Sequence, residues 1–269
     1  MKIKILMENQ AVNESFACGH GLSIYVETGK HKIMMDAGPD WRFADNALRL
    51  GVDISDVDIL VLSHGHYDHS GGLMKFMAMN DKAKIYAADG YCLPHYNENG
   101  AYIGVEPLAV DHPRITVLDG DLEIDEEVKI LGFRKERLFE TINTCGMTEG
   151  RVDGLKNFKI YPEAFAHEHY LFVNDGESSV LFSGCSHKGI INIATWAMKY
   201  NPTAIMGGFH LMGVKPENYN MLDHVAEALL ELPMNYYTGH CTGSAQFEYL
   251  KERMGDRLNY AAAGAEFEI

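Results

Sequence analysis

The sequence has few basic residues relative to acidic ones, and it contains no long apolar run. Its 269 residues include 23 Lys and Arg against 38 Asp and Glu, which gives a formal net charge of −15. Because nucleic-acid binding draws much of its affinity from phosphate neutralisation, this balance argues against a nucleic-acid partner. Isolated basic residues such as Lys135 and Arg137 still offer a site for a single phosphate. No apolar stretch of about 18 residues occurs, so we expect no membrane span.

Cysteine is scarce, and the first residues lack the features of a signal peptide. The five cysteines are odd in number and form no Cys-x-x-Cys pair, which argues against a disulfide framework. Residues 1–6 alternate like a first strand and contain neither an apolar core nor a cleavage site. We therefore expect a cytoplasmic protein with reduced thiols that acts on a small molecule. The 14 methionines leave open whether the chain assembles with a second copy of itself.

The pattern of apolar residues indicates two similar blocks of alternating strands and helices. Strands are expected at 3–6, 22–27, 32–36, 57–62, 84–88, 115–118, 128–131, 170–174, 179–183, 204–207 and 234–238, and helices at 41–50, 72–79, 190–200, 218–230 and 244–254. Two such blocks favour sheets packed face to face with helices outside. We expect one α/β domain over residues 1–269, with an irregular insertion near 133–166 that lies over the site.

Three histidines and an aspartate are concentrated in one short segment. Residues 63–69 read Ser-His-Gly-His-Tyr-Asp-His and directly follow an apolar run that fits a buried strand. The polar side chains therefore lie at the carboxyl end of a strand. We expect His64 and His66 to face one cation, while Asp68 and His69 face a second. Imidazole and carboxylate ligands suit zinc, iron or manganese better than calcium.

Residues 64–69 resemble the signature of the metallo-β-lactamase-fold superfamily of metallohydrolases. The resemblance implies an αββα four-layer sandwich and two divalent transition metal ions, with zinc expected first and iron or manganese as alternatives. It also implies a late strand-end histidine in the second metal site, a role that His240 fits. Related enzymes usually carry a bridging Asp where this sequence has Cys185. A thiolate can ligate such a metal, so Cys185 is a candidate ligand, with an inert buried thiol as the alternative.

In the same superfamily, the third histidine of the first metal site usually precedes the hairpin that leads to this turn. His167 and His169 both occur there, and side chains two residues apart on a strand share a face. We favour His167, because it lies further into the loop before the apolar run. His169 remains the alternative ligand.

Other polar residues close further strands and are expected on the same rim. His187 precedes a predicted helix, where free backbone amides favour anions; it can be a ligand, or it can act on the substrate as a catalytic residue. His20 and His210 are expected to bind substrate. The alternative for His210 is a polar residue whose hydrogen bonds are all made within the protein, with no functional role. Asp36 is expected to accept a hydrogen bond from a ligating imidazole.

Four further short segments make the resemblance specific to one branch of the superfamily, and it covers about residues 22–243. They are His20-Gly21-Leu22-Ser23, Gly184-Cys185-Ser186-His187, Gly207-Gly208-Phe209-His210 and His240-Cys241-Thr242-Gly243. With the metal motif, they are similar to the branch named for 7,8-dihydropterin-6-methyl-4-(β-D-ribofuranosyl)-aminobenzene-5′-phosphate synthase, an archaeal pterin-pathway enzyme.

The chemistry expected from the residues is hydrolysis of a small anionic, for example phosphorylated, metabolite. Two adjacent cations activate a water, and Asp68 is expected both to ligate and to orient that water. A synthase reaction of the kind named for the branch is the alternative. A di-iron oxidoreductase is disfavoured, because the relative with that chemistry carries an acidic residue at the position of His66. A metal-binding sensor without turnover is a further alternative.

Overall fold

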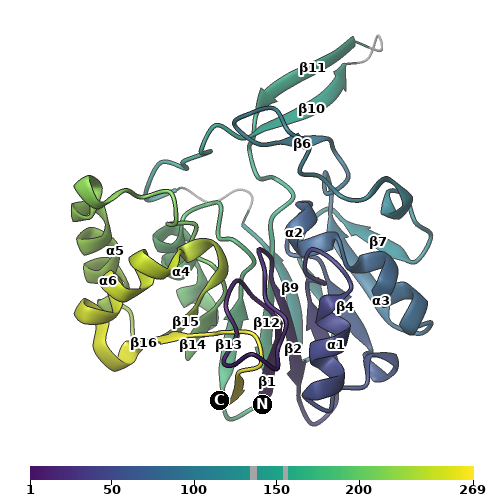
Figure 1. The fold of residues 1–269 in the computed structure, drawn as a ribbon, viewed down its shortest axis with the longest axis horizontal. Coiled ribbons are helices and arrows are strands. Elements are labelled where there is room, and N and C mark those ends of the chain that lie inside the picture. Colours follow the sequence, from purple (N-terminus) through teal and green to yellow (C-terminus); the bar gives the residue numbers. More distant parts are fainter. Residues whose placement is uncertain (134–137, 154–156) are drawn as a thin grey trace.

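The strands of the computed structural model form two large sheets and one small sheet. The structure describes residues 1–133, 138–153 and 157–269 (Figure 1). Within these residues the first sheet has seven strands, in the spatial order β17 (Glu266–Glu268), β1 (Lys2–Met7), β2 (Ser23–Glu27), β3 (Lys32–Met35), β4 (Ile59–Val61), β5 (Lys84–Ala88) and β7 (Ile115–Leu118).

The second large sheet is built mainly from the later half of the chain. Its seven described strands follow the order β16 (Leu258–Tyr260), β15 (Asn235–Thr238), β14 (Ala204–Met206), β13 (Ser179–Phe182), β12 (His169–Asn174), β9 (Val128–Gly132) and β8 (Leu122–Glu123). The small sheet contains β11 (Asn157–Pro162), β10 (Thr148–Asp153) and β6 (His95–Tyr96).

Helices cover the outer face of each large sheet (Figure 1). Those described are α1 (Arg42–Arg49), α2 (Tyr67–Ser70), α3 (Leu73–Met79), α4 (Ile190–Ala197), α5 (Asn220–Leu230) and α6 (Ser244–Met254). Short 3₁₀ helices occur at Ile54–Asp56, Pro107–Ala109, Met198–Tyr200, Pro216–Asn218, His240–Thr242 and Gly255–Arg257.

Three clusters of buried hydrophobic side chains fill the spaces between the two sheets and between each sheet and its helices. Between the two sheets, Val61 of the first belongs to the same cluster as Leu171 and Phe182 of the second. Phe43 belongs to the cluster between α1, α3 and the first sheet. Trp196 belongs to the cluster that joins α4, α5 and α6 to the second sheet. The predicted αββα sandwich is therefore confirmed.

The carboxyl ends of the central strands meet at one edge of the sandwich. Strands β3, β4 and β5 run parallel to one another, and so do β13, β14 and β15. In open α/β sheets, ligands bind beyond the carboxyl ends of parallel strands. The loops that follow β3, β4, β13 and β15 carry the polar residues of the candidate site.

The segment expected to be irregular, residues 133–166, contains the β10–β11 hairpin, which projects away from the body (Figure 1). Val152, Phe158 and Ile160 are all exposed on this hairpin. Strands were not predicted there, because the segment has no core-facing apolar face of the kind that patterning detects. No helix in the described part of the chain is long and apolar enough to cross a membrane.

Candidate metal centre

Four buried side chains from both sheets converge on one point. They are Asp68, His69, Cys185 and His240, and one potential ligand atom of each lies within 4.8 Å of those of the others. His69 Nε2 is 3.1 Å from Cys185 Sγ and 3.1 Å from His240 Nε2, and the latter is 3.2 Å from Asp68 Oδ2. Ligands at the usual zinc–nitrogen distance of a tetrahedral site are separated by about 3.3 Å. The spacing therefore suits a four-coordinate cation.

A second cluster shares the sulfur of Cys185 with the first. His64 and His187 join Cys185 in a group whose ligand atoms also lie within 4.8 Å of one another, and all three side chains are buried. The two imidazole Nε2 atoms are 3.2 Å apart. Cys185 is thus shared by these two donor groups, at the position for which the resemblance implies a bridging carboxylate.

One buried carboxylate fixes the protonation of histidines in both clusters. Asp36 Oδ2 lies 2.6 Å from His69 Nδ1 and accepts a hydrogen bond from the Ser63 hydroxyl at 2.7 Å. Because that hydroxyl proton points to Asp36, Ser63 Oγ accepts the 2.8 Å hydrogen bond from His64 Nδ1. With Nδ1 protonated in both rings, the Nε2 atoms of His64 and His69 each carry a lone pair that can bind a cation. The carboxylate–histidine arrangement is the one that orients metal-ligating imidazoles.

His240 is fixed in the same way from a different part of the chain. Its Nδ1 lies 3.0 Å from Asn9 Oδ1, and its backbone N–H donates to the buried Glu8 carboxylate. Its Nε2 therefore also presents a lone pair, and that lone pair faces the one on His69. Two lone pairs at 3.1 Å require a cation between them, either a proton or a metal ion. The donor set thus fits a divalent transition metal.

The pKa values of these groups follow from their burial and from their neighbours. Burial lowers the pKa of His64 and His187 well below the usual value, so both present neutral rings at pH 7. Burial also lowers the pKa of His69, but the carboxylates of Asp36 and Asp68 outweigh it and raise the pKa to about 9. Without metal, a proton therefore occupies His69, and metal binding must release it.

Several residues of the centre adopt backbone conformations that are uncommon outside glycine. Asp36, Ser186, His210 and His240 have φ values of 62°, 59°, 54° and 48°. Each such conformation costs on the order of 1 kcal/mol and persists only where the surrounding contacts impose it. These residues follow strand ends, where the left-handed turn directs the chain back over the edge of the sheet.

His167, the predicted third ligand of the first site, lies in a separate cluster. It joins His66, His95 and Glu163 in a buried group whose ligand atoms lie within 4.8 Å of one another. The N–H of Gly65 donates to His167 Nδ1 at 2.9 Å, so the ring proton is on Nε2, 2.7 Å from Glu163 Oε1. Hydrogen bonds thus occupy both nitrogens of His167. The ring nitrogen that lies beside His64 Nε2 is that of His187, at 3.2 Å.

The structure also shows where other residues named from the sequence lie. The alternative ligand, His169, is buried at the start of β12, and its backbone N–H donates to the Ser63 carbonyl at 2.7 Å. Lys135 and Arg137 lie outside the described residues. His95 and Glu163 were not predicted, because they occur in no motif and become neighbours of His66 only through the small sheet.

A pocket of about 220 Å³ opens beside the two clusters. His20, His66, Asp68, His187 and His210 are among the residues that line it, together with Met147 and Met212. His20 Nε2 lies 3.3 Å from Asp68 Oδ2. The rim positions predicted for His20 and His210 therefore border the same space as the clustered donors.

Comparison with known proteins places this geometry in a family. The sequence profile of the metallo-beta-lactamase superfamily matches residues 17–210. The chain belongs to the metallo-beta-lactamase superfamily. Membership implies divalent metal binding, which agrees with the donor clusters found here.

Two proteins of Methanocaldococcus jannaschii resemble this superfamily member along most of its length. An uncharacterised protein is 30% identical over 249 residues, which is 90% of each chain. The 7,8-dihydropterin-6-methyl-4-(beta-D-ribofuranosyl)-aminobenzene-5′-phosphate synthase is 28% identical over 278 residues, covering 90% of this chain and 88% of its own. The predicted resemblance to the synthase branch is therefore confirmed.

A solved structure agrees with these likenesses. The crystal structure of Tm1679, a metal-dependent hydrolase of the beta-lactamase superfamily, superposes with a TM-score of 0.83 at 26% identity. The match covers 100% of this chain and 99% of the other. Together the relatives indicate an enzyme with the fold of metal-dependent hydrolases.

Proposed function

We propose that the protein is a metal-dependent hydrolase of a small anionic metabolite, with phosphorylated esters as the first substrates to test. The observation that carries the proposal is the convergence of oriented lone pairs from His64, His69 and His240 on the shared sulfur of Cys185. Zinc is the first candidate metal, with iron or manganese as alternatives. Two bound cations would supply an activated water near neutral pH and would polarise the substrate oxygen under attack.

The side chains around the cations have separate tasks in this reaction. Asp68 would be a ligand, and its carboxylate would accept the hydrogen bond that orients the attacking water. His187 Nε2 lies 3.2 Å from His64 Nε2, so of its two expected roles, ligand and catalytic residue, we assign it that of a ligand. This proposal gives His167 no ligand role, because hydrogen bonds occupy both of its ring nitrogens. It gives His169 none either, because His169 falls in none of the donor clusters found among the described residues.

The pocket beside the centre is suited to a small anion. His20 and His210 line it and carry ring nitrogens that can donate to substrate oxygens. His210 Nδ1 is buried without a hydrogen-bond partner among the described residues, which leaves it free for a ligand. A cavity of about 220 Å³ has room for a compact metabolite.

A synthase is the alternative function, and one observation favours it. The named relative with 28% identity over 90% of this chain is a synthase of 7,8-dihydropterin-6-methyl-4-(beta-D-ribofuranosyl)-aminobenzene-5′-phosphate. The clustered ligands serve either reaction, because both need a polarised phosphate or ribose oxygen. A pterin or aromatic amine co-substrate must then enter the pocket together with a sugar phosphate.

The test combines metal analysis with a substrate screen. Protein purified without chelator should contain one to two equivalents of a transition metal. It should also hydrolyse a member of at least one of four substrate classes: phosphodiesters, thioesters, lactones and phosphorylated ribosides. Turnover of a ribosyl phosphate only when a pterin or an aromatic amine is added would favour the synthase. A protein that binds no zinc, iron or manganese, and whose thermal unfolding ignores all three, would exclude both functions.

Three alanine variants separate ligands from substrate contacts in the same assay. His240→Ala should remove at least one metal equivalent and abolish turnover. His210→Ala should retain the metal and raise KM, because its ring lines the pocket outside the site of His69 and His240. His224→Ala is the matched control, since His224 is exposed on α5 and should change neither quantity.

A further inference from the structure

Glu163 is a buried carboxylate that the proposed reaction does not use. Its side chain is fully buried, directly after β11 in the chain. Burying a carboxylate costs several kcal/mol unless hydrogen bonds and a nearby positive charge compensate it. The ion-pair partners that the described residues provide for it are the rings of His66, His95 and His167.

Two of these rings hold Glu163 in place. His167 donates through Nε2 to Oε1 at 2.7 Å, since its Nδ1 is occupied by the Gly65 amide. His95 Nδ1 lies 3.0 Å from Oε1 and 3.1 Å from Oε2. The rings of His95 and His167 also lie against each other, with centroids 4.2 Å apart. The carboxylate is therefore clamped from one side.

The other side of the carboxylate faces His66, the second histidine of the metal motif. Glu163 Oε2 is 3.7 Å from His66 Nε2, and that buried nitrogen has no hydrogen-bond partner among the described residues. The His66 ring also lies 4.9 Å from the ring of His187, on the side of the metal centre. With Nε2 directed to Glu163, the ring nitrogen left for a cation is Nδ1.

This arrangement repeats, around His66, the support that the first sheet gives to His69. In that case the Asp36 carboxylate binds one ring nitrogen and leaves the other for the cation. We propose that Glu163, clamped by His95 and His167, is the positioning residue that orients His66 toward a divalent cation and supplies negative charge behind it. The inference rests on the metal-dependent function proposed above. Replacing an outer carboxylate of this kind typically lowers metal affinity by about 10–100-fold.

The small sheet explains how residues distant in sequence reach this position. β6 begins with His95 and pairs with β10, and Glu163 donates its backbone N–H to the carbonyl of Met147 at 3.0 Å. His95 and Glu163 therefore both lie at the base of the projecting hairpin, which is seen in Figure 1. The hairpin strands β10 and β11 thus have a role at the metal centre, although β11 itself is exposed along its whole length.

The test measures metal affinity by competition with a chromophoric chelator, using Zn²⁺ and Mn²⁺. Glu163→Gln keeps the size of the side chain and removes its charge, and it should weaken one of two metal equivalents by about 10–100-fold. Glu127→Gln is the matched control, because Glu127 accepts a hydrogen bond from Thr28 in a turn at the far end of the strands. It should leave both equivalents unchanged. If Glu163→Gln does not fold, Glu163→Asp, which withdraws the carboxylate by one methylene, should weaken the same equivalent.

A double-mutant cycle distinguishes orientation of His66 from a general structural role. In a His66→Ala background, Glu163→Gln should cause no further loss of affinity, because the ring through which it acts is absent. Equal losses in both backgrounds, or no loss in the single variant, would overturn the inference. A third metal equivalent that disappears in Glu163→Gln would overturn it too, by showing that the cluster itself binds metal. Failure of the unaltered protein to bind any metal would instead refute the proposed function, and this inference with it.

Discussion

At the scale of single residues, Asp36 has the widest influence on the metal centre. One of its oxygens contacts His69 directly and also accepts the hydroxyl proton of Ser63, which in turn accepts from His64. The other oxygen accepts the Ser63 backbone N–H at 2.7 Å. A single side chain thus sets the tautomer of one candidate ligand in each cluster. Its φ of 62° is accounted for by these contacts.

Asp36→Asn should therefore weaken both metal equivalents, not one. An amide presents one acceptor atom and an N–H₂ group, so it cannot satisfy the Ser63 hydroxyl, the Ser63 amide and His69 together. We expect each equivalent to lose about 10–100-fold in affinity, measured by chelator competition. Asp40→Asn is the control, since Asp40 lies near the same loop but pairs with Arg42 at the surface. Loss of a single equivalent would show that Ser63 does not transmit the effect to His64.

The residues of the centre differ in how far the sequence could predict them. Spacing alone brings Asp68 and His69 together, because they share one turn of α2 after a strand. Glu163 could not be found in this way. Its partner His95 is 68 residues away, and their contact depends on β6 pairing with β10, which no local pattern encodes. His187 was predicted as a rim residue, but its distance to His64 depends on how the two sheets pack.

At the scale of elements, the placement of α2 depends on two glycines that follow it. A Cβ atom on Gly71 would lie 2.0 Å from the Pro39 carbonyl oxygen, and one on Gly72 would lie 2.1 Å from that of Ala37. Any side chain at either position would meet backbone, which cannot rotate away. The close approach locks α2, and with it Asp68, against the loop that carries Asp36.

Gly71→Ala should consequently destabilise the protein and disturb the metal centre together. Overpacking of this kind costs about 1–3 kcal/mol, which in a chain of this size lowers Tm by at least about 2 °C. The measurement is thermal unfolding of the metal-loaded protein, followed by metal analysis. Gly29→Ala provides the control, because a Cβ there meets nothing within 4 Å. A Gly71→Ala protein as stable as the Gly29→Ala protein would show that the loop yields to the added methyl group.

Prediction of elements succeeded where a strand or helix buries an apolar face. Strands such as β2, β5 and β13 and helices such as α1 and α6 occur within a residue or two of their expected bounds, because burial imposes a periodic pattern. β11 was missed because all six of its residues are exposed. β16 and β17 are three-residue edge strands, too short for a pattern to be recognised.

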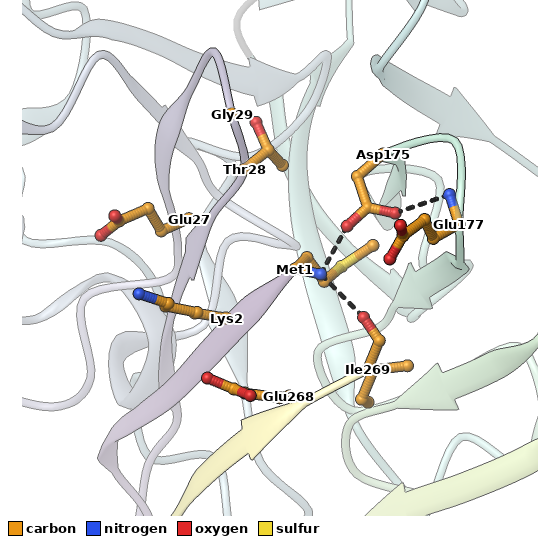
Figure 2. A pocket seen from close by; sticks show the side chains of 9 residues that line it. All are labelled: Met1, Lys2, Glu27, Thr28, Gly29, Asp175, Glu177, Glu268 and Ile269. Carbon is orange, nitrogen blue, oxygen red and sulfur yellow. Dashed lines mark hydrogen bonds and ion pairs between the residues drawn. The ribbon is translucent and has the colours of Figure 1, made fainter.

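At the scale of the whole molecule, the two sheets are joined at both ends of the sandwich. At one end, the metal centre draws donors from the loops of both sheets. At the other, the turn after β2 meets the turn before β9, where Thr28 donates to Glu127 at 2.6 Å and His31 Nε2 lies 2.6 Å from Asp125 Oδ2. Figure 2 shows the adjoining pocket, in which Thr28 and Asp175 lie near Met1 and Ile269. This polar end contains none of the clustered histidines of the metal centre.

The contact between His31 and Asp125 should stabilise the protein in a pH-dependent way. Burial raises the pKa of Asp125, but the hydrogen bond with His31 and the amides of Glu127 and Val128 outweigh it, so the folded pKa lies below the usual value. A depressed carboxyl pKa contributes stability above the unfolded pKa of about 3.9, and this contribution is lost as the pH falls through the folded pKa.

Asp125→Asn should therefore lower the free energy of unfolding at pH 7 by up to about 1 kcal/mol. The difference from the unaltered protein should shrink as the pH falls below the unfolded pKa of about 3.9. Chemical denaturation of both proteins at each pH gives this difference, and loss of metal at low pH affects them equally because Asp125 lies at the far end of the sandwich. Asp81→Asn, at an exposed position, is the control for the effect of an Asp-to-Asn substitution at the surface. A difference for Asp125→Asn that persists unchanged from pH 7 to pH 3 would mean that the turn needs the shape of the side chain and not its charge. In that case the charge of Asp125 would contribute nothing to holding the two sheets together at this end, where Lys30 also pairs with Glu126 and Glu127.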